Sequence, residues 1–458
     1  MTPRVAVVGG GLAGITAALA CADAGYRVTL YESRPRLGGL TYSFERGGLR
    51  VDNGQHVFLR CCERYRALLT RLGVERDVNL QERLDIPVRG LSPGTSTAET
   101  FTAAGRLRRL SLPAPLHLSW ALLRYPWLDT AARVRFVRAA LALRAVDPAD
   151  PRSDTTSFGA WLREYGQDRA AIESLWDLVG IATLNARADD VSLALAATVF
   201  QIGLLTEAAA ADIGWARVPL GQLHGEAAGR ALAASGVDVV THAKVTAVRQ
   251  APGGWALSAD DTAVTADAVV LAVPPDAAAA LLPPGAVDLG PDWAAALGSS
   301  PIINVHAVYD RKVMDGPFLA GIGTAAQWVF DRTAASGLDD GQYLAVSVSA
   351  ADEFVDLPTA ELRRRFLPAL NALLPATRAA EVRDFFVTRE RHATFRPSPG
   401  TTRLRPAART ALPGLYLAGA WTATGWPATM EGAVRSGESA SAALLSDLSP
   451  IRSREAVR

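Results

Sequence analysis

The 458-residue sequence predicts an α/β protein in which two domains are interleaved along the chain. Three observations predict it. The chain opens with a strand, a glycine turn, a helix and a second strand. Strand patterns of the same kind return in the middle of the chain and near its end. Of the two segments between them, the first has a helical pattern and the second mixes strands and a helix. We therefore predict a discontinuous nucleotide-binding domain and an α+β substrate domain built by its inserts, with these ranges: 1–88, 216–290 and 401–458 for the first, 89–215 and 291–400 for the second.

The first four elements follow from simple patterns. Arg4–Val8 is a short apolar strand, and Gly9–Gly14 is a glycine-rich turn. Ile15–Ala24 is rich in alanine, which favours a helix. Tyr26–Tyr31 alternates as a second strand and ends at Glu32. This order is that of a βαβ unit with a parallel sheet, which makes the first domain Rossmann-like.

The glycines of the turn match the pattern GxGxxG. Gly9 allows the tight turn, Gly11 lets the backbone approach a pyrophosphate, and Gly14 lets the helix pack closely on the strand. The helix N-terminus offers free N–H groups to the phosphates. Glu32 stands where a carboxylate accepts hydrogen bonds from a ribose. The pattern predicts a bound dinucleotide.

The later elements are read in the same way. Strands are predicted at Val237–Val240, Lys244–Gln250, Trp255–Ser258, Asp267–Val273 and Leu415–Gly419, with a helix at Glu431–Leu445. The insert of about 90–215 is predicted to be helical. The second insert mixes strands and a helix, at Ile302–Tyr309, Tyr343–Ser349 and Thr359–Leu374.

Composition narrows the function. Hydrophobic residues make up 49%, charged residues 20%, and the net charge is +1, which argues against a nucleic-acid binder. The three cysteines form no CxxC pair, so we expect a reducing, cytoplasmic setting and no metal site. The longest apolar run, Val191–Leu205, is too short to span a bilayer.

Two segments carry a resemblance to a known superfamily. Glu32-Ser33-Arg34, followed by Gly38-Gly39, resembles the ExRxxxGG extension of the FAD-dependent amine oxidases and phytoene desaturases, and Gly419–Gly437 resembles their second FAD motif. The resemblance implies the amine-oxidase-like fold and FAD bound non-covalently, since all cysteines lie in the first 62 residues. Many relatives carry an acid at the position of Ala420. The implied FAD-binding residues are Gly9, Gly11, Leu12, Ala13, Gly14, Glu32, Ser33, Arg34, Gly38, Gly39, Gln55, His56, Val245, Gly419, Ala420, Thr429, Met430 and Ala433.

Other segments resemble one branch of that superfamily, hydroxysqualene dehydroxylase. They are Val51–His56, Asn304–His306, Gln327–Arg332 and Trp426–Gly432, of which Gln55-His56 is the most characteristic. That family reduces hydroxysqualene to squalene with reduced FAD and releases water. Amine oxidases carry a lysine where Asn304 stands and an aromatic residue where Thr429 stands, so the resemblance argues against amine oxidation.

The chemistry of dehydroxylation suggests catalytic candidates. Loss of an allylic hydroxyl needs a proton donor, for which histidine is suited, so His56 and His306 are candidates, with Asn304 on the same strand face as His306. Trp328, Trp421 and Trp426 are candidates for the substrate cavity, where aromatic faces stabilise a developing cation. The alternatives are that His56 only binds the flavin or a carbonyl, that His306 is a satisfied core histidine, and that the tryptophans only pack.

The resemblance implies an apolar C30 isoprenoid as the substrate. We also expect a separate electron donor, because no second nucleotide motif is visible. Residues 106–146 hold eight arginines and one acid, Asp129, among tryptophans and leucines. This region either docks on anionic lipid, with contributions from Arg106, Arg108 and Arg109, or is an ordinary solvated face. The first interpretation places the protein in the cytoplasm, peripherally on the inner face of the membrane.

Three other functions stay open. A carotenoid-type desaturase runs hydride transfer in the opposite direction and also needs FAD and an apolar tunnel. An amine oxidase is disfavoured by Asn304 and Thr429. A flavin-bound protein without activity could present isoprenoids to another enzyme.

Overall fold

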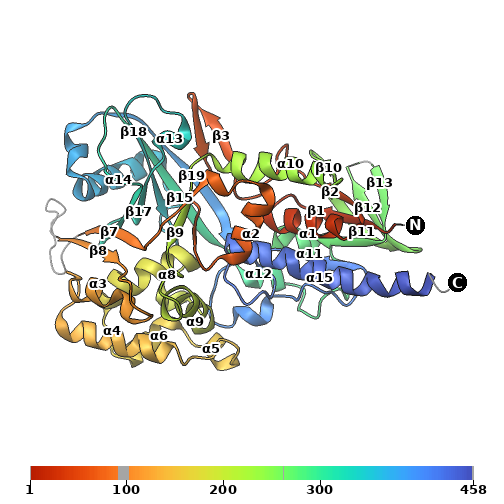
Figure 1. The fold of residues 1–458 in the computed structure, drawn as a ribbon, viewed down its shortest axis with the longest axis horizontal. Coiled ribbons are helices and arrows are strands. Elements are labelled where there is room, and N and C mark those ends of the chain that lie inside the picture. The colour runs from red at the N-terminus through yellow and green to blue at the C-terminus, as the bar shows by residue number, and fades with distance from the viewer. Residues whose placement is uncertain (1, 91–102, 261, 456–458) are drawn as a thin grey trace.

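The computed structural model describes residues 2–90, 103–260 and 262–455 (Figure 1). Figure 1 shows an elongated molecule with both termini at one end. The strands that carry the nucleotide motifs lie at this end, and the larger mixed sheet lies toward the other. No helix of the described residues is long and apolar enough to cross a membrane.

A five-stranded parallel sheet forms the nucleotide-binding part. Its order is β10-β2-β1-β14-β20, and every neighbouring pair is parallel. The central strands β1 and β14 and the neighbouring β20 are apolar and almost wholly buried, as in doubly wound sheets, whereas the edge strand β10 is largely exposed. Their bounds are β1 (Arg4–Val8), β2 (Arg27–Tyr31), β10 (Asp238–Val240), β14 (Ala268–Leu271) and β20 (Leu415–Leu417). The prediction of a Rossmann-like fold is confirmed, and the strands of its sheet come from distant segments of the chain.

Helices and a small sheet cover this core. Helix α1 (Leu12–Asp23) packs against the long C-terminal helix α15 (Met430–Glu455), and both belong to one apolar cluster. Also in this part lie α2 (Glu63–Leu72), α10 (Ala227–Ala234), α11 (Pro275–Leu281), α12 (Trp293–Leu297) and the antiparallel sheet of β11 (Val245–Ala251), β12 (Gly254–Ala259) and β13 (Thr262–Ala266).

A seven-stranded mixed sheet forms the second part, in the order β19-β15-β18-β17-β16-β7-β8. Helix α14 (Thr359–Leu373) buries Leu362, Phe366 and Leu370 in the apolar cluster of this sheet. The strands are β7 (Asp85–Gly90), β8 (Ala103–Arg108), β15 (Ser300–Tyr309), β16 (Phe318–Ile322), β17 (Trp328–Asp331), β18 (Gln342–Val348) and β19 (Val382–Thr394). The predicted domain boundary at residue 88 therefore falls inside β7, because this strand pairs with β8 and β16.

The described part of the first insert is mostly helical, as predicted, apart from β8 and from β9 at its C-terminal end. Residues 103–108 form β8, because they pair antiparallel with β7; residues 91–102 lie outside the described part. The helices are η2 (Leu116–Leu118), α3 (Ser119–Leu123), α4 (Thr130–Leu143), α5 (Pro151–Thr155), α6 (Phe158–Glu164), α7 (Arg169–Ala171), η3 (Ile172–Trp176), α8 (Asp177–Leu184), η4 (Ala188–Asp190), α9 (Leu193–Phe200) and η5 (Gln201–Leu205).

Short elements make up the remaining regular structure of the described residues. They are β3 (Ser43–Arg46), β4 (Leu49–Asp52), β5 (Val57–Leu59), η1 (Glu75–Asp77), β6 (Val78–Leu80), β9 (Ile213–Ala216), η6 (Gly221–Glu226), α13 (Thr333–Ser336), η7 (Pro375–Ala379) and η8 (Thr401–Leu404). The segment between β4 and β5 contains Asn53–His56 and lies beside the cavity described below.

Candidate active site

One cavity of about 1970 Å³ extends from the nucleotide motifs to the helical insert. Its lining includes Gly9 and Glu32 at one end and Trp328 and Leu141 at the other. A pocket for a single small ligand commonly measures about 300–1,000 Å³, so this cavity has room for a dinucleotide and a second large molecule.

The glycines at the nucleotide end have two distinct roles. Gly9 has a φ of +109°, and a Cβ there would overlap the carbonyl oxygen of Ala272. A Cβ on Gly14 would overlap the carbonyl oxygen of Gly9, so the fold itself requires both glycines. Gly11 has a φ of −76°, and the nearest atom to a Cβ there is the Gly39 Cα at 3.8 Å. Nothing in the protein excludes a side chain at Gly11, which lines the cavity where the pyrophosphate of FAD would lie.

Glu32 joins the first motif to the second. Its carboxylate is buried at the end of β2 and accepts hydrogen bonds from the backbone N–H of Gly10 and of Arg34, each at 2.7 Å. The Ser33 hydroxyl donates to the same carboxylate at 3.2 Å. A carboxylate has about four acceptor positions, so one remains for a ribose hydroxyl of the nucleotide. Glu32, Ser33 and Arg34 all line the cavity, as FAD binding requires.

The glycine turn Gly9–Gly14 and the pair Gly38-Gly39 are in direct contact. The Gly38 N–H donates to the carbonyl of Gly10 at 2.8 Å, and a Cβ on Gly39 would lie 2.9 Å from the Gly11 Cα. The remaining residues predicted to hold FAD at this end also line the cavity; they are Leu12, Ala13, Gly38, Gly39 and Val245.

The C-terminal motif closes the other side of the nucleotide site. Thr429 caps α15 by accepting a hydrogen bond from the Gly432 N–H at 3.1 Å, which leaves the helix N-terminus facing the cavity. Gly419, Ala420, Thr429, Met430 and Ala433 all line this wall. The positive end of the helix dipole favours negative charge there.

Arg405, which the sequence analysis missed, holds the loop between β20 and α15. Its buried guanidinium donates to backbone carbonyls at 2.6–3.3 Å, those of Ala420, Trp421, Thr422 and Trp426. Burial lowers the pKa of Arg405 to about 10. No sequence motif marks this residue, because its partners lie 15 to 21 positions away on an irregular loop.

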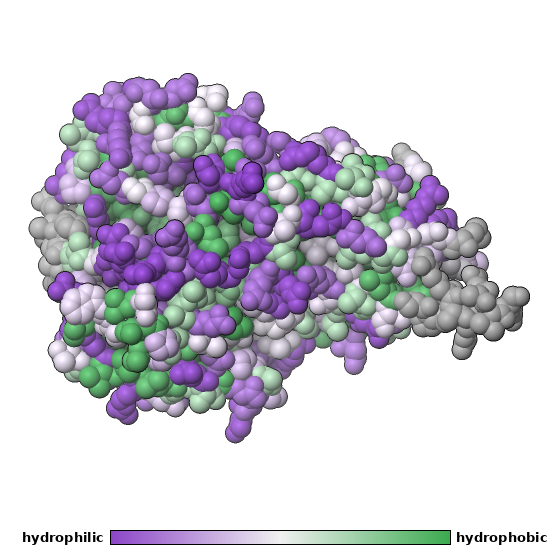
Figure 2. Space-filling model, in the orientation of Figure 1, coloured by the Kyte–Doolittle hydropathy of each residue, from purple (hydrophilic) through white to green (hydrophobic). Residues whose placement is uncertain are grey.

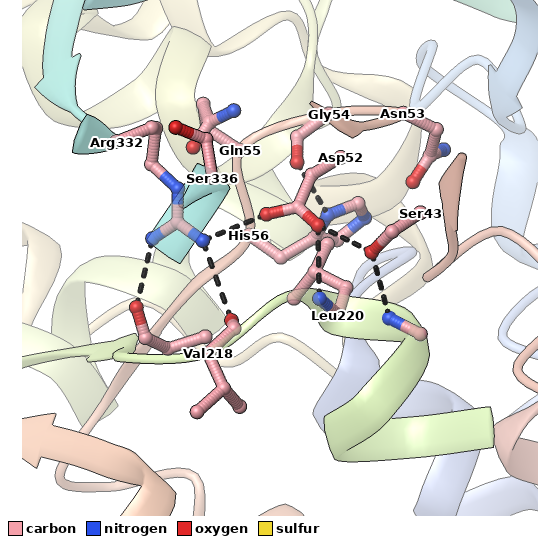
Figure 3. A network of polar contacts seen from close by, with 12 residues as sticks. Ser43, Asp52, Asn53, Gly54, Gln55, His56, Val218, Leu220, Arg332 and Ser336 are labelled. Atoms are coloured by element: carbon pink, nitrogen blue, oxygen red, sulfur yellow. Dashed lines mark hydrogen bonds and ion pairs between the residues drawn. The ribbon is translucent and has the colours of Figure 1, made fainter. Parts of the chain in front are cut away.

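Asp52 fixes the segment that approaches the cavity from β4. Its buried carboxylate accepts from Arg332 at 2.7 Å, from the Leu220 N–H at 2.9 Å and from the Ser43 hydroxyl at 2.6 Å (Figure 3). Arg332 also donates to the carbonyl of Ala216 at 2.7 Å. This network connects β4 to β17 and η6, and it holds Asn53–His56 in place.

Asn304 is a positioning residue for the same segment. Its amide Nδ2 donates to the Asn53 carbonyl at 3.2 Å, and its Oδ1 accepts from the Gln55 N–H at 3.3 Å. The Nε2 of Gln55 is buried without a hydrogen-bond partner among the described residues and belongs to the cavity lining. An unpaired buried donor indicates that a ligand supplies the acceptor, which fits FAD.

His56 projects from this segment into the cavity lining. Its Nδ1 lies 3.3 Å from the Gly54 carbonyl (Figure 3). Because a carbonyl only accepts, the neutral ring carries its proton on Nδ1, and Nε2 is left with a free lone pair. Burial lowers the pKa of His56, and the hydrogen bond to Gly54 partly opposes this.

His306 is a correction to the sequence analysis. It does not line the cavity, and both ring nitrogens are occupied. The Tyr343 hydroxyl lies 2.7 Å from Nδ1, Thr388 Oγ1 lies 3.1 Å from Nε2, and the ring stacks on Phe386 at 4.4 Å. Burial lowers the pKa of His306 to about 3. The side chain is a neutral core histidine and is not placed to donate a proton to a molecule in the cavity.

The three predicted tryptophans all line the cavity but differ in their surroundings. Trp328 groups with Phe318 and Phe330 at centroid distances of 6.0–6.3 Å, and the three rings form an aromatic wall. Trp421 is buried and donates to the Val273 carbonyl at 3.0 Å, which is a packing role. The sequence analysis did not identify Phe318 and Phe330. Phe330 lies two positions after Trp328 on β17, so the two side chains are on the same face of the strand.

The three arginines predicted to contact lipid form ion pairs with acidic residues of the protein. Arg106 and Arg108 pair with Asp85, and Arg109 pairs with the buried Asp212. Both acids lie outside residues 106–146, so the sequence of that segment alone overstated its free positive charge.

Comparisons with known proteins agree with this geometry. The profile described as flavin containing amine oxidoreductase matches residues 12–445, and the chain belongs to this family. It is an FAD-dependent oxidoreductase. A hydroxysqualene dehydroxylase of Rhodopseudomonas palustris is 30% identical, over 96% of this chain and 98% of its own. A zeta-carotene desaturase of Capsicum annuum is 27% identical, over 96% of this chain and 80% of its own.

Solved structures show the same fold at low identity. A variant of putrescine oxidase has a TM-score of 0.72 at 21% identity, over 97% of this chain and 99% of its own. Cyclohexylamine oxidase of Brevibacterium oxydans has a TM-score of 0.71 at 20% identity, over 98% of this chain and 100% of its own. The predicted amine-oxidase-like fold is confirmed.

Proposed function

We propose that this enzyme removes the hydroxyl of hydroxysqualene reductively and forms squalene. The observation that carries the proposal is the single cavity, in which an aromatic and aliphatic compartment continues from the FAD site past His56. When bound and reduced, FAD supplies the hydride that replaces the C–O bond by a C–H bond, and the hydroxyl leaves with a proton as water. The relatives named hydroxysqualene dehydroxylase support this substrate class.

In this proposal His56 transfers the proton and Asn304 positions its segment. The cation of His56 donates from Nε2 to the leaving oxygen, while Nδ1 stays on the Gly54 carbonyl. Trp328 and its aromatic neighbours exclude water and face the carbon that loses the hydroxyl. Asp52 and Arg332 act only through the backbone that carries His56.

A carotenoid-type desaturase is the second candidate, and one observation favours it. Because burial lowers the pKa of His56, the neutral form with a free Nε2 dominates near neutral pH. A neutral imidazole is a base, and desaturation requires a proton acceptor. Relatives named zeta-carotene desaturase match with similar coverage of this chain.

Amine oxidation is not supported by the site. The two lysines of the sequence are Lys244, which lines the nucleotide end of the cavity beside Val245, and Lys312, which pairs with Asp315. Asn304 uses both ends of its amide on the backbone, and Thr429 caps α15.

We propose that a separate carrier delivers the electrons and that the enzyme works at the inner face of the cell membrane.

An anaerobic single-turnover experiment tests the function. The purified holoenzyme is reduced chemically, hydroxysqualene is added, and squalene is followed by mass spectrometry together with flavin reoxidation. We expect squalene in step with reoxidation and a rate constant that falls as pH rises, because the acid form of His56 is required. Oxidised enzyme that desaturates a polyene, with a rate that rises with pH, would favour the second candidate.

A matched pair of variants tests the role of His56. His56→Gln is expected to keep its flavin and to lose about 100-fold or more in the rate constant, in the range of general-acid contributions. His242→Asn, at an exposed position, is the control and keeps the wild-type rate. An unchanged rate and pH profile for His56→Gln would remove it as the acid. If the wild-type protein bound the isoprenoid tightly but showed no turnover, it would instead be a protein that presents isoprenoids to another enzyme.

A further inference from the structure

Two short helical segments expose apolar side chains at the end of the cavity farthest from the nucleotide motifs. Five apolar residues of these two segments are solvent-exposed and also line the cavity, and we call them its apolar rim: Leu116 (58% exposed), Leu123 (59%), Val134 (57%), Val137 (44%) and Leu141 (48%). Trp120, 49% exposed, and Leu112, 42% exposed, lie beside this rim along the chain. Figure 2 shows hydrophobic surface at the lower left, over the region where Figure 1 places α3 and α4.

The spacing shows that the exposure follows helix faces. Leu116, Trp120 and Leu123 are separated by four and three positions, and Val134, Val137 and Leu141 by three and four. Trp120 and Leu123 therefore share one side of α3, and Val134, Val137 and Leu141 share one side of α4, while Leu116 lies in η2 directly before α3. The fold is held by other residues of the same segment, such as Tyr125, Trp127, Ala139 and Leu143, all of which are buried. The apolar rim therefore contributes little to folding.

We infer that the apolar rim docks on an anionic lipid bilayer and that the cavity opens directly into the lipid. The apolar side chains enter the acyl boundary, and a substrate dissolved in the bilayer then reaches the cavity without crossing water. The identity of that substrate rests on the proposed function; the docking surface itself does not.

The charges beside the apolar rim select lipid headgroups as the partner. Arg124, Arg138 and Arg144 are exposed, and none has a carboxylate within ion-pair distance among the residues that the structure describes. The Arg124 guanidinium lies 4.3 Å from the Trp120 ring centroid. The one acid of the segment, Asp129, caps α4 by accepting from the Ala132 N–H at 2.7 Å. A surface with unpaired arginines around an apolar centre fits anionic headgroups over acyl chains.

This surface differs from the one that the sequence alone suggested. Arg106 and Arg108 share Asp85, and Arg109 is held by Asp212, so these three arginines offer less free charge than their number suggests. The apolar rim and the three unpaired arginines are instead expected to carry the interaction.

Vesicle flotation tests the inference with the holoenzyme and vesicles of phosphatidylcholine with or without phosphatidylglycerol. We expect binding to the anionic vesicles that added salt weakens. Leu116→Ser/Leu123→Ser should lower the partition coefficient at least about tenfold, because two exposed leucines lose their burial in lipid. Arg124→Ser/Arg138→Ser/Arg144→Ser should remove the preference for anionic lipid. Val240→Ser, 40% exposed on β10, and Arg106→Ser/Arg108→Ser are controls that should bind as the wild type does.

Two further readouts keep the outcomes distinct. Bound flavin, measured by absorbance, confirms that each variant is folded, and light scattering reports its oligomeric state. Relative to the wild type, turnover by the leucine variant should fall further with substrate in vesicles than with substrate dispersed in detergent. Absence of vesicle binding by the wild type, or a dimer that the leucine variant dissociates, would overturn the inference. Vesicle binding without squalene formation would leave the docking intact and refute the proposed function alone.

Discussion

Gly11 is a position where the fold leaves room for a side chain and the cofactor does not. Its φ of −76° and ψ of 176° suit any residue, and a Cβ would approach only the Gly39 Cα, at 3.8 Å. Gly11→Ala should therefore change the free energy of unfolding of the cofactor-free protein by less than about 1 kcal/mol, in the stabilising direction, because alanine restricts the unfolded chain.

The same methyl group should weaken FAD binding. It occupies space beside the pyrophosphate, and forcing a group into a filled site costs about 1–3 kcal/mol, which corresponds to a Kd raised about 5- to 150-fold. Gly11→Val should cost more and leave a colourless protein. Gly14→Ala is the contrasting variant, since its Cβ would overlap the Gly9 carbonyl oxygen and destabilise the cofactor-free protein itself.

Two measurements on the cofactor-free protein separate these effects. Titration with FAD, followed by quenching of flavin fluorescence, gives the Kd, and urea unfolding gives the stability. Wild-type affinity in Gly11→Val would refute the placement of the pyrophosphate. An apoprotein of Gly11→Ala as unstable as that of Gly14→Ala would refute the assignment of separate roles to the two glycines.

Two further predictions concern buried polar groups. Arg332→Met leaves the Asp52 carboxylate buried without its cation and should lower the free energy of unfolding by about 3–5 kcal/mol in urea titrations. The double variant Asp52→Asn/Arg332→Met should recover part of this stability. An equal loss of stability in the single and the double variant would argue against an ion pair between the two residues. The pKa of His306 is about 3 when folded and 6.5 by reference, so between these values only the unfolded state binds a proton there. The free energy of unfolding should fall as pH drops through this range, by about 2 kcal/mol at pH 5 from this group. His306→Phe should lack this contribution in pH-dependent urea titrations. If the variant had the same pH dependence as the wild type, the imidazole would not be kept neutral in the folded protein.

Local sequence determined the nucleotide site. The residues from Gly9 to Gly14 and from Glu32 to Gly39 form two turns whose geometry follows from glycine positions and short spacings. The structure places the FAD-binding residues predicted there on the cavity lining, except Gly14, which packs against the Gly9 carbonyl. The strand and helix of the C-terminal motif were predicted for the same reason. Patterns over 10 to 20 residues report local conformation, since backbone preferences and side-chain periodicity act over that distance.

Tertiary structure decided the roles of residues that look alike in sequence. His56 and His306 were both candidates, with His306 the weaker, and only the fold shows that one lines the cavity while the other is enclosed by Tyr343 and Thr388. Arg332 pairs with Asp52, 280 positions earlier. Residues 106–109 were grouped with a basic helical surface, but pairing with β7 makes most of them part of a strand and gives their arginines acidic partners. Burial and ion pairing depend on contacts between distant segments, which composition and periodicity do not encode, so charge counts and histidine positions alone could not settle these roles.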